Sequence, residues 1–386
     1  MTTPILGSTA TGRLLAALFM QGAMTRSDAT AIAGVARSAA GRAVEDLGRL
    51  GLLDASPPVP PGTRGRPSSF LAPRSSGAGV VAGVLGRDGI ALAIIDLGHA
   101  TRFRAERRFD VAAETPARTL EILGGFLREA IDDSPLPVVG VGLSVPGIFN
   151  QQTGYAQALL PIGWRDVEMI HALERWLPAG LPLQIAHDAT LAALAEFRWG
   201  AGRGAQRLLF LSGQRVGVGS ALIVADEQAG RSDHSLQAGH LLVEPDGPAC
   251  SCGAHGCLEL FIDGRAIARA LGREPHATAA ELRHALESEC DDTVFADVVK
   301  HLQTGLISLA NTLAPDRIIL SGLLAGVVSR FEGPLSRALG TSVVAQLDPI
   351  ELAPSILDDD VLVGAAELAF EPLLRDPEAV VLGVGA

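Results

Sequence analysis

The sequence predicts an α/β protein in which a small helical head precedes two α/β lobes. The first 75 residues read as three helices followed by a hairpin, whereas short apolar strands alternate with helices from residue 77 onward. A second set of strands and helices begins near residue 182, which is typical of two successive lobes. The 386 residues are also too many for one ordinary core. The expected domains are 1–75 for the head, 76–187 with 363–386 for the first lobe, and 188–362 for the second lobe.

The order of elements in the head is that of a helix-turn-helix domain. Thr25 or Ser27 can cap a short second helix, and Gly34 supplies the turn before the third. The Pro/Gly-rich stretch "PPVPPGTRGRP" then suits a wing. Ala36 stands where a capping side chain is expected, and Gly41 costs the third helix about 1 kcal/mol relative to Ala. We therefore expect a winged helix-turn-helix whose third helix is less rigid than usual until it binds DNA.

Charge is distributed unevenly along the chain. The net charge is −12, yet the first 75 residues hold eight arginines and four acidic residues. This basic head favours operator DNA as a partner, while the acidic remainder argues against nucleic acid covering the whole surface. A plain three-helix bundle with solvated arginines is the alternative.

The candidate DNA contacts are Arg37, Ser38 and Arg42 in the major groove, with Arg64 and Arg66 on the wing for phosphates or the minor groove. Because such heads bind in pairs, we expect a homodimer or homotetramer.

The sequence contains no run of about 18 apolar residues, and its N-terminus lacks the basic region of a signal peptide. We therefore expect a cytoplasmic protein with no membrane partner.

Three of the four cysteines are crowded into "CSCGAHGCLE", residues 250–259. In a cytosolic protein this spacing favours a metal over a disulfide framework. Three thiolates and one imidazole fill a tetrahedral zinc shell and leave no open position, so such a zinc is structural and not catalytic. Three reduced, buried cysteines without metal are the alternative.

Several sequence blocks resemble the ROK family, which comprises sugar-responsive transcriptional repressors and sugar kinases. The blocks are "GVGLSVPG" (140–147), "GWRDV" (163–167), "HDATLAALAEFRWGAG" (187–202), "GQRVGVGSALIV" (213–224), "QAGHLLVEPDGPACSCGAHGCLE" (237–259) and "PDRIILSG" (315–322). The resemblance covers essentially residues 77–373, and the head looks like the family's winged helix-turn-helix, which its kinases lack. It implies a two-lobed, actin/hexokinase-like (ribonuclease H-like) ROK domain.

The resemblance also assigns a metal site and a sugar site. It implies one structural zinc ion on His240, Cys250, Cys252 and Cys257, with His255 as a rival fourth ligand. It places a small carbohydrate or a derivative in a cleft between the lobes, on His187, Asp188, Gln237, His240 and Glu259. His187 stands where the family has Asn, and Gln237 where it has Glu. Since these side chains offer different donors and acceptors, the preferred sugar stays open.

The phosphate loops distinguish a regulator from a kinase. In kinases of the family, Asp188 would be the base, and an Asp-x-Gly-Gly-Thr-Lys-like loop cradles the phosphates. Here that loop has Val84 for the acid, Arg87 for a glycine and Asp88 for the threonine, and Asp88 would repel a triphosphate. The second loop, 212–219, carries Gln214 and Arg215. We therefore predict a sugar-responsive regulator, a repressor, with no catalytic residues. An ATP-dependent ROK sugar kinase and a regulator that has lost sugar binding are the alternatives.

Overall fold

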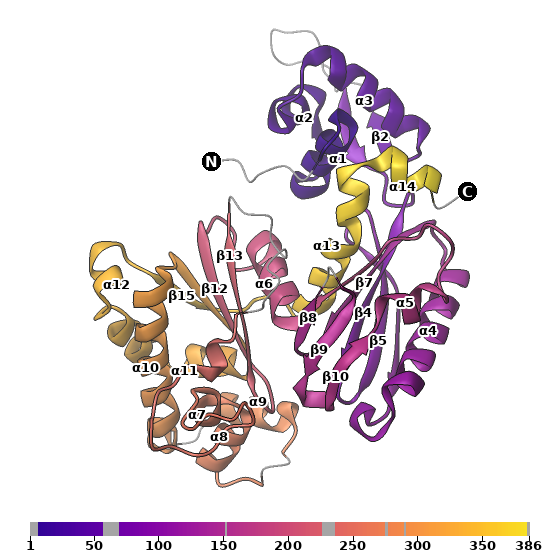
Figure 1. Ribbon diagram of the computed structural model, residues 1–386. Coiled ribbons are helices and arrows are strands. Elements are labelled where there is room, and N and C mark those ends of the chain that lie inside the picture. Colours follow the sequence, from indigo (N-terminus) through magenta and orange to yellow (C-terminus); the bar gives the residue numbers. More distant parts are fainter. Residues whose placement is uncertain are drawn as a thin grey trace. The chain divides into compact units, whose positions relative to one another are not determined.

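The computed structural model describes residues 7–56, 69–150, 153–225, 236–274, 277–288 and 291–383. The chain divides into two compact units (Figure 1). The first comprises residues 1–187 and 361–386, and the second comprises residues 188–360.

The head of the first unit contains three helices and a small antiparallel sheet. The helices are α1 (Ala10–Gln21), α2 (Arg26–Ala33) and α3 (Arg37–Arg49), and the sheet has the order β1-β3-β2 with β1 (Met24–Thr25), β2 (Leu53–Ser56) and β3 (Phe70–Pro73). The Thr25 hydroxyl accepts a hydrogen bond from the Asp28 amide and so caps α2, and Gly34 ends α2 in the left-handed conformation with φ of 60°. The predicted helix order and turn are therefore confirmed. Arg64 and Arg66 of the predicted wing lie outside the described residues.

A five-stranded mixed sheet, in the order β11-β7-β4-β5-β6, forms the centre of the first unit. Its strands are β4 (Gly79–Gly86), β5 (Gly89–Asp96), β6 (Thr101–Arg108), β7 (Val138–Val145) and β11 (Leu183–His187). Apolar residues of α4 (Pro116–Asp132) pack on this sheet in one buried cluster. A second sheet, β10-β9-β8, is built from β8 (Ile148–Asn150), β9 (Tyr155–Leu159) and β10 (Trp164–Glu168), followed by α5 (Ile170–Glu174). This small sheet was not among the predicted elements.

Helix α13 (Asp360–Arg375) joins the sheet of the first unit to the head, and α14 (Pro377–Gly383) follows it. A Cβ atom at Gly142 of β7 would collide with the carbonyl oxygen of Ala365, so the missing side chain lets α13 approach the strand closely. At its other end, α13 contacts α1, where the Phe19 and Phe370 ring centroids are 5.1 Å apart. The head is therefore packed against the carboxyl-terminal helix and not simply tethered by a linker.

The second unit is built on a four-stranded sheet in the order β13-β12-β14-β15. The strands are β12 (Arg207–Gly213), β13 (Val218–Val224), β14 (Arg317–Gly322) and β15 (Glu351–Pro354). Its longer helices are α6 (Asp188–Trp199), α10 (Ala296–Leu313) and α11 (Leu323–Leu339), and its shorter ones are α7 (Glu259–Ile262), α8 (Gly264–Ala270), α9 (Ala279–Glu287) and α12 (Val343–Leu347). The sheet and helices α7 to α11 share one apolar core, which supports the segment from His240 to Glu259.

A buried carboxylate fixes the end of α6, the helix that begins with Asp188. Glu196 is fully buried. One of its oxygens accepts hydrogen bonds from the Ser355 hydroxyl and the amides of Ile356 and Leu357, at 2.8, 3.0 and 3.0 Å. The other accepts from the Ala201 amide at 2.7 Å. The carboxylate thus satisfies donors from two separate segments, which offsets the cost of burying its charge.

Replacement of Glu196 by Gln should destabilise the second unit by about 2–4 kcal/mol, because an amide donor would then face backbone donors that need an acceptor. The matched control is Glu351→Gln, which removes an ion pair between Arg317 and a carboxylate that is 58% exposed, and should cost less than about 1 kcal/mol. Urea unfolding followed by circular dichroism measures both changes. Equal midpoints for the two variants would contradict this role of Glu196.

Candidate zinc and ligand site and DNA-binding surface

Four side chains of the second unit converge as a metal-binding cluster. The ligand atoms of His240, Cys250, Cys252 and Cys257 all lie within 4.8 Å of one another. The Cys252 and Cys257 sulfurs are 3.6 Å apart, as are the Cys250 sulfur and the His240 Nδ1 atom. With Zn–S bonds of about 2.3 Å, a tetrahedral zinc ion places its sulfur ligands roughly 3.8 Å apart. The residues therefore fit one structural zinc ion.

The fold decides between the two histidines that the sequence offers as the fourth ligand. His255 is exposed, lies outside the cluster and places its Nδ1 atom 3.3 Å from the carbonyl oxygen of Gly247. His240 Nδ1 faces the sulfurs instead. The predicted set of three cysteines and His240 is confirmed, and His255 is not part of it.

The environment of the thiols makes zinc binding proton-coupled. Burial, together with the neighbouring sulfurs, raises the pKa of the Cys257 thiol to about 12. Burial also raises the pKa of Cys250, whereas a hydrogen bond from the Ala254 backbone lowers the pKa of the exposed Cys252 thiol. Because zinc binds thiolates, the ion would have to displace protons from the two buried thiols.

A buried histidine that sequence reasoning missed fastens the zinc-binding segment to α10. The His301 Nε2 atom lies 3.2 Å from a carboxylate oxygen of Glu244, which lies between the metal ligands in the sequence. The other ring nitrogen is 2.8 Å from the carbonyl oxygen of Asp297. The ring stacks on Phe261 at a centroid distance of 4.0 Å. A contact between residues 57 positions apart leaves no local sequence signal, so only the fold brings His301 to this segment.

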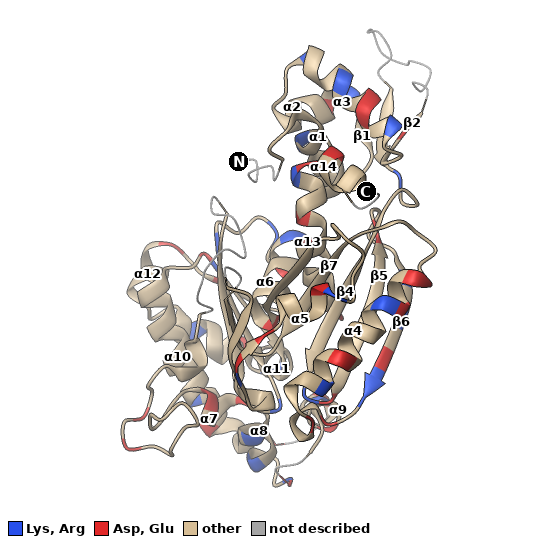
Figure 2. Cartoon of the chain, turned by 45° about the vertical axis from the view of Figure 1, so that its right-hand side comes forward, with Lys and Arg blue, Asp and Glu red and all other residues tan. Residues whose placement is uncertain are grey.

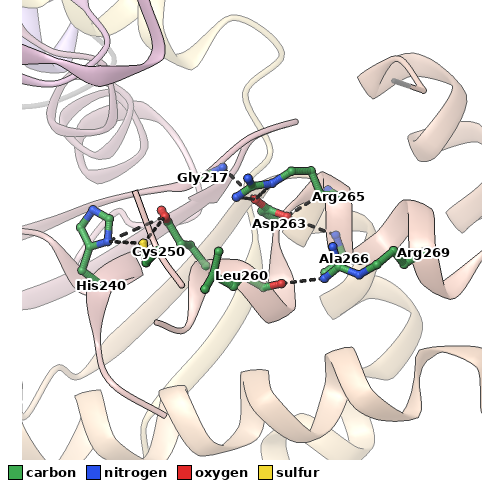
Figure 3. A network of polar contacts seen from close by, with 9 residues as sticks. Gly217, His240, Cys250, Leu260, Asp263, Arg265, Ala266 and Arg269 are labelled. Atoms are coloured by element: carbon green, nitrogen blue, oxygen red, sulfur yellow. Dashed lines mark hydrogen bonds and ion pairs between the residues drawn. The ribbon is translucent and has the colours of Figure 1, made fainter. Parts of the chain in front are cut away.

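Two of the predicted ligand-binding residues lie beside the zinc cluster. An oxygen of the buried Glu259 carboxylate accepts a hydrogen bond from the Cys250 thiol at 3.2 Å and lies 3.8 Å from His240 Nδ1 (Figure 3). The other oxygen faces Gly217 and Gly239, where a Cβ atom would lie 3.4 Å away in each case. The two glycines leave this side of the carboxylate without side-chain cover. The structure thus brings His240 and Glu259 together next to the metal.

The remaining predicted ligand residues lie at the ends of elements. Asp188 is the first residue of α6, is half-buried, and lies against Gly219 of β13, where a Cβ atom would be 3.8 Å from its carboxylate. Gln237 is exposed and begins the single 3₁₀ turn that ends at His240. His187 is the last residue of β11 and belongs to the first unit, whereas the other four belong to the second.

The first phosphate-loop position is a tight hairpin turn. Gly86 pairs with Gly89, so only Arg87 and Asp88 connect β4 to β5. The Arg87 guanidinium donates to the carbonyl oxygen of Pro161 at 3.1 Å, and the backbone carbonyl of Asp88 accepts from the Phe109 amide. These contacts hold the two-residue turn against Pro161 and Phe109, and its side chains are a cation and an anion where a phosphate cradle has small residues.

The second phosphate-loop position is also internally bonded. The Gly217 amide donates to the carboxylate of Asp263 at 3.0 Å (Figure 3). The Gln214 amide donates to the carbonyl oxygen of Gly217 at 3.1 Å. Asp263 is fully buried and also bonds Arg265 and the Ala266 amide. The hairpin is therefore held to the start of α8, and the Gly217 amide is already satisfied.

The predicted DNA-contacting residues of α3, Arg37, Ser38 and Arg42, are exposed and lie in its first two turns. Figure 2 shows basic residues on α3. Within the described part of the chain, Arg37 and Arg42 form no ion pair, whereas Arg49 pairs with Asp46 at 2.5 Å and Arg74 with Asp54 at 2.7 Å. Ser38 is exposed beside Arg37. As the sequence indicated, Ala36 provides no side-chain cap to α3. The uncompensated arginines thus include those at the start of the third helix.

Comparison with known proteins identifies a family for most of the chain. The model of the ROK family matches residues 81–371. A glucokinase of Halalkalibacterium halodurans is 32% identical over 205 residues, which cover 48% of this chain and 61% of that enzyme. The xylose repressor of Bacillus subtilis is 25% identical over 254 residues, covering 64% of this chain and 65% of the repressor. The chain thus matches less than two thirds of the length of either protein.

Solved structures share the fold. A ROK family transcriptional regulator, described as a homolog of the E. coli MLC protein, aligns over 97% of this chain and 98% of its own with a TM-score of 0.76 and 20% identity. The ROK hexokinase from Thermus thermophilus covers 76% of this chain and 99% of its own, with a TM-score of 0.60 and 26% identity. The regulator's fold therefore extends over nearly the whole chain, head included.

In the described residues, no helix is long and apolar enough to cross a membrane.

Removal of one metal ligand should separate the roles of the two histidines. Removal of a residue that only hydrogen-bonds to a metal ligand typically weakens metal binding roughly 10–100-fold. We expect His240→Ala to weaken zinc binding by more than this, because it removes a ligand and opens the tetrahedral shell. His255→Ala is the control and should keep one zinc per chain. Metal analysis after dialysis against a chelator measures both. Loss of zinc from the His255 variant alone would contradict the ligand set.

Proposed function

Since the chain belongs to the ROK family, we propose that it is a transcriptional regulator, a repressor, whose affinity for operator DNA is set by a carbohydrate-type ligand bound beside the zinc site. The observation that carries this proposal is the head: a helix-turn-helix domain precedes the ROK domain, and its Arg37 and Arg42 are exposed and form no ion pair with a described residue. Such unpaired guanidinium groups suit DNA bases and phosphates. Arg64 and Arg66 belong to the proposed surface as residues of the wing.

The proposed ligand contacts are His187, Asp188, Gln237, His240 and Glu259. Carboxylates of Asp188 and Glu259 are strong acceptors for adjacent sugar hydroxyls, and Gln237 can both donate and accept. With Nδ1 turned toward the sulfurs, His240 keeps Nε2 for a hydroxyl, so zinc would orient this ring toward the ligand. Zinc supplies rigidity here and no chemistry, because its four protein ligands leave no open position.

Ligand control of DNA binding requires two states with different affinities. A ligand that discriminates between them by about 1–3 kcal/mol changes operator affinity roughly 5–150-fold. We propose that the regulator acts in the cytoplasm as a homodimer or homotetramer, because two-fold related heads match the two halves of an operator. The xylose repressor of Bacillus subtilis, similar over 64% of this chain, supports a regulator that responds to a sugar.

A ROK sugar kinase is the second candidate, favoured by the similarity to a glucokinase and by the aspartate at position 188. Against it stand the two-residue turn at Arg87–Asp88 and the Gly217 amide that Asp263 already binds. Phosphoryl transfer depends on amides and metal ligands placed around the phosphates, whereas Asp88 would repel a triphosphate at the first loop and the Gly217 amide is already bonded at the second. A regulator that has lost sugar binding is the third candidate.

DNA binding is tested by replacing both arginines of α3. The Arg37→Ala, Arg42→Ala double variant should lose at least about 10-fold in affinity for the intergenic DNA next to its own gene, since each good base contact is worth about 1–3 kcal/mol. Arg49→Ala is the control, because Asp46 already neutralises Arg49. Fluorescence anisotropy measures both variants. If the wild-type chain binds none of the neighbouring intergenic regions, the proposal fails.

Ligand binding is tested with a panel of free hexoses, pentoses, N-acetyl sugars and their phosphates. A true ligand at 100 times its Kd should stabilise the chain by about 2.7 kcal/mol, which raises the melting temperature. Asp188→Asn and Glu259→Gln should abolish that shift, and no sugar should promote ATP turnover. ATP turnover that Asp188→Asn removes would instead establish the kinase.

A further inference from the structure

The side chain of Arg26, at the start of α2, lies against the third helix at Gly41. A Cβ atom at Gly41 would lie 3.1 Å from the terminal nitrogen Nη2 of Arg26, with no other heavy atom of a non-neighbouring residue within 4 Å. Gly41 has no positive φ that would require glycine. Since glycine weakens a helix interior, its presence calls for another reason. The space that it leaves for the Arg26 guanidinium provides one.

The charge of Arg26 is not neutralised within the described part of the chain. Its half-buried guanidinium makes no hydrogen bond or ion pair with a described residue. The nearest carboxylate in the sequence, Asp28, accepts a hydrogen bond from the Thr25 hydroxyl at 2.7 Å. A cation in the first turn of a helix is also opposed by the helix dipole. The fold therefore holds an uncompensated cation against α3 at a local cost in stability.

The position of this cation relates it to the proposed DNA contacts. Gly41 lies four residues after Arg37, one turn along the same face of α3, so the Arg26 guanidinium adjoins the face that carries Arg37. Arg42 follows Gly41 directly in the sequence. Arg37 and Arg42 are both exposed and, among the described residues, neither has an acid partner. The guanidinium of Arg26 and that of Arg37 thus adjoin one face of α3 without an acid partner in the described part of the head, whereas Arg49 and Arg74 are both paired with acids.

We propose that Arg26 binds a phosphate of the DNA backbone beside the bases that α3 reads, and that Gly41 is retained because it gives the guanidinium room. This inference rests on the proposed function. A guanidinium presents a planar fork of donors that matches a phosphate, and its contact with α3 limits the conformations that it would lose on binding. Phosphate contacts fix the position of a protein on the duplex without reading sequence. Arg26 therefore contributes affinity and register, and Arg37 and Arg42 contribute specificity.

The charge is tested by Arg26→Gln, with binding to the intergenic fragment and to a random-sequence duplex measured across a salt series. The variant should bind both DNAs more weakly by a similar factor, and the slope of log affinity against log salt should fall by about 1 in magnitude. Arg26→Lys should restore the slope. Arg49→Gln is the matched control and should leave it unchanged. An unchanged slope in Arg26→Gln overturns the proposal.

The role of Gly41 is tested by Gly41→Gln, alone and combined with Arg26→Gln. Glutamine is a better helix former, so the single variant should melt at a higher temperature and yet bind DNA more weakly, because its side chain displaces the guanidinium. In the Arg26→Gln background the same change should add no further loss. Fully additive losses would show that residue 41 acts on DNA directly, which overturns the link between the two residues.

A failure of the proposed regulator and a failure of the Arg26 contact give different results. A wild-type chain that binds neither DNA defeats the proposed regulator and this inference together. A wild-type chain that binds DNA with normal salt dependence, alongside an Arg26→Gln variant that matches it, defeats only the role of Arg26.

Discussion

Coordination of a zinc ion by His240 and three cysteines is the constraint on which the proposed ligand site depends. The segment between these residues has no helix longer than a single turn, and two isolated β-bridges join Leu242 to Cys257 and Ala249 to His255. Backbone hydrogen bonds give the segment local order, and metal ligation and the His301 contact with Glu244 fasten it further. Glu259 follows the last cysteine by two residues, which ties the position of its carboxylate to the metal. A structural ion can thus shape a binding site without taking part in any reaction.

The distribution of satisfied and unsatisfied polar groups separates the parts of this protein by role. At the two positions where kinases of the family bind phosphates, backbone groups are already bonded within the chain, as for Gly217 with Asp263. In the head the opposite holds, since Arg26, Arg37 and Arg42 have no acid partner among the described residues. A buried group that is fully bonded stabilises a fold, whereas an uncompensated cation is available to an anionic partner. The uncompensated charges of the head therefore suit an anionic partner.

The carboxyl-terminal helix gives the head a fixed support. Helix α13 begins at Asp360, whose carboxylate accepts a hydrogen bond from Ser321 of the second unit, and it ends where Arg375 accepts one from Ser8. Between these points it lies on β7, at glycines that allow its backbone to approach closely. Within the first unit, α13 therefore connects the sheet to the head through packed contacts.

The sequence by itself determined the features that depend on neighbouring residues. Thr25 and Gly34 set the ends of α2, apolar periodicity marked the helices and strands, and the spacing of the cysteines indicated zinc, because each signal lies within a few residues. Only the tertiary structure decided among long-range partners. It selected His240 over His255 as the metal ligand and brought Glu196 to amides about 160 residues away in the sequence. It also assembled β8, β9 and β10 into a separate sheet and placed Arg26 against Gly41. These contacts depend on how elements pack in space, and local periodicity carries no information about that packing.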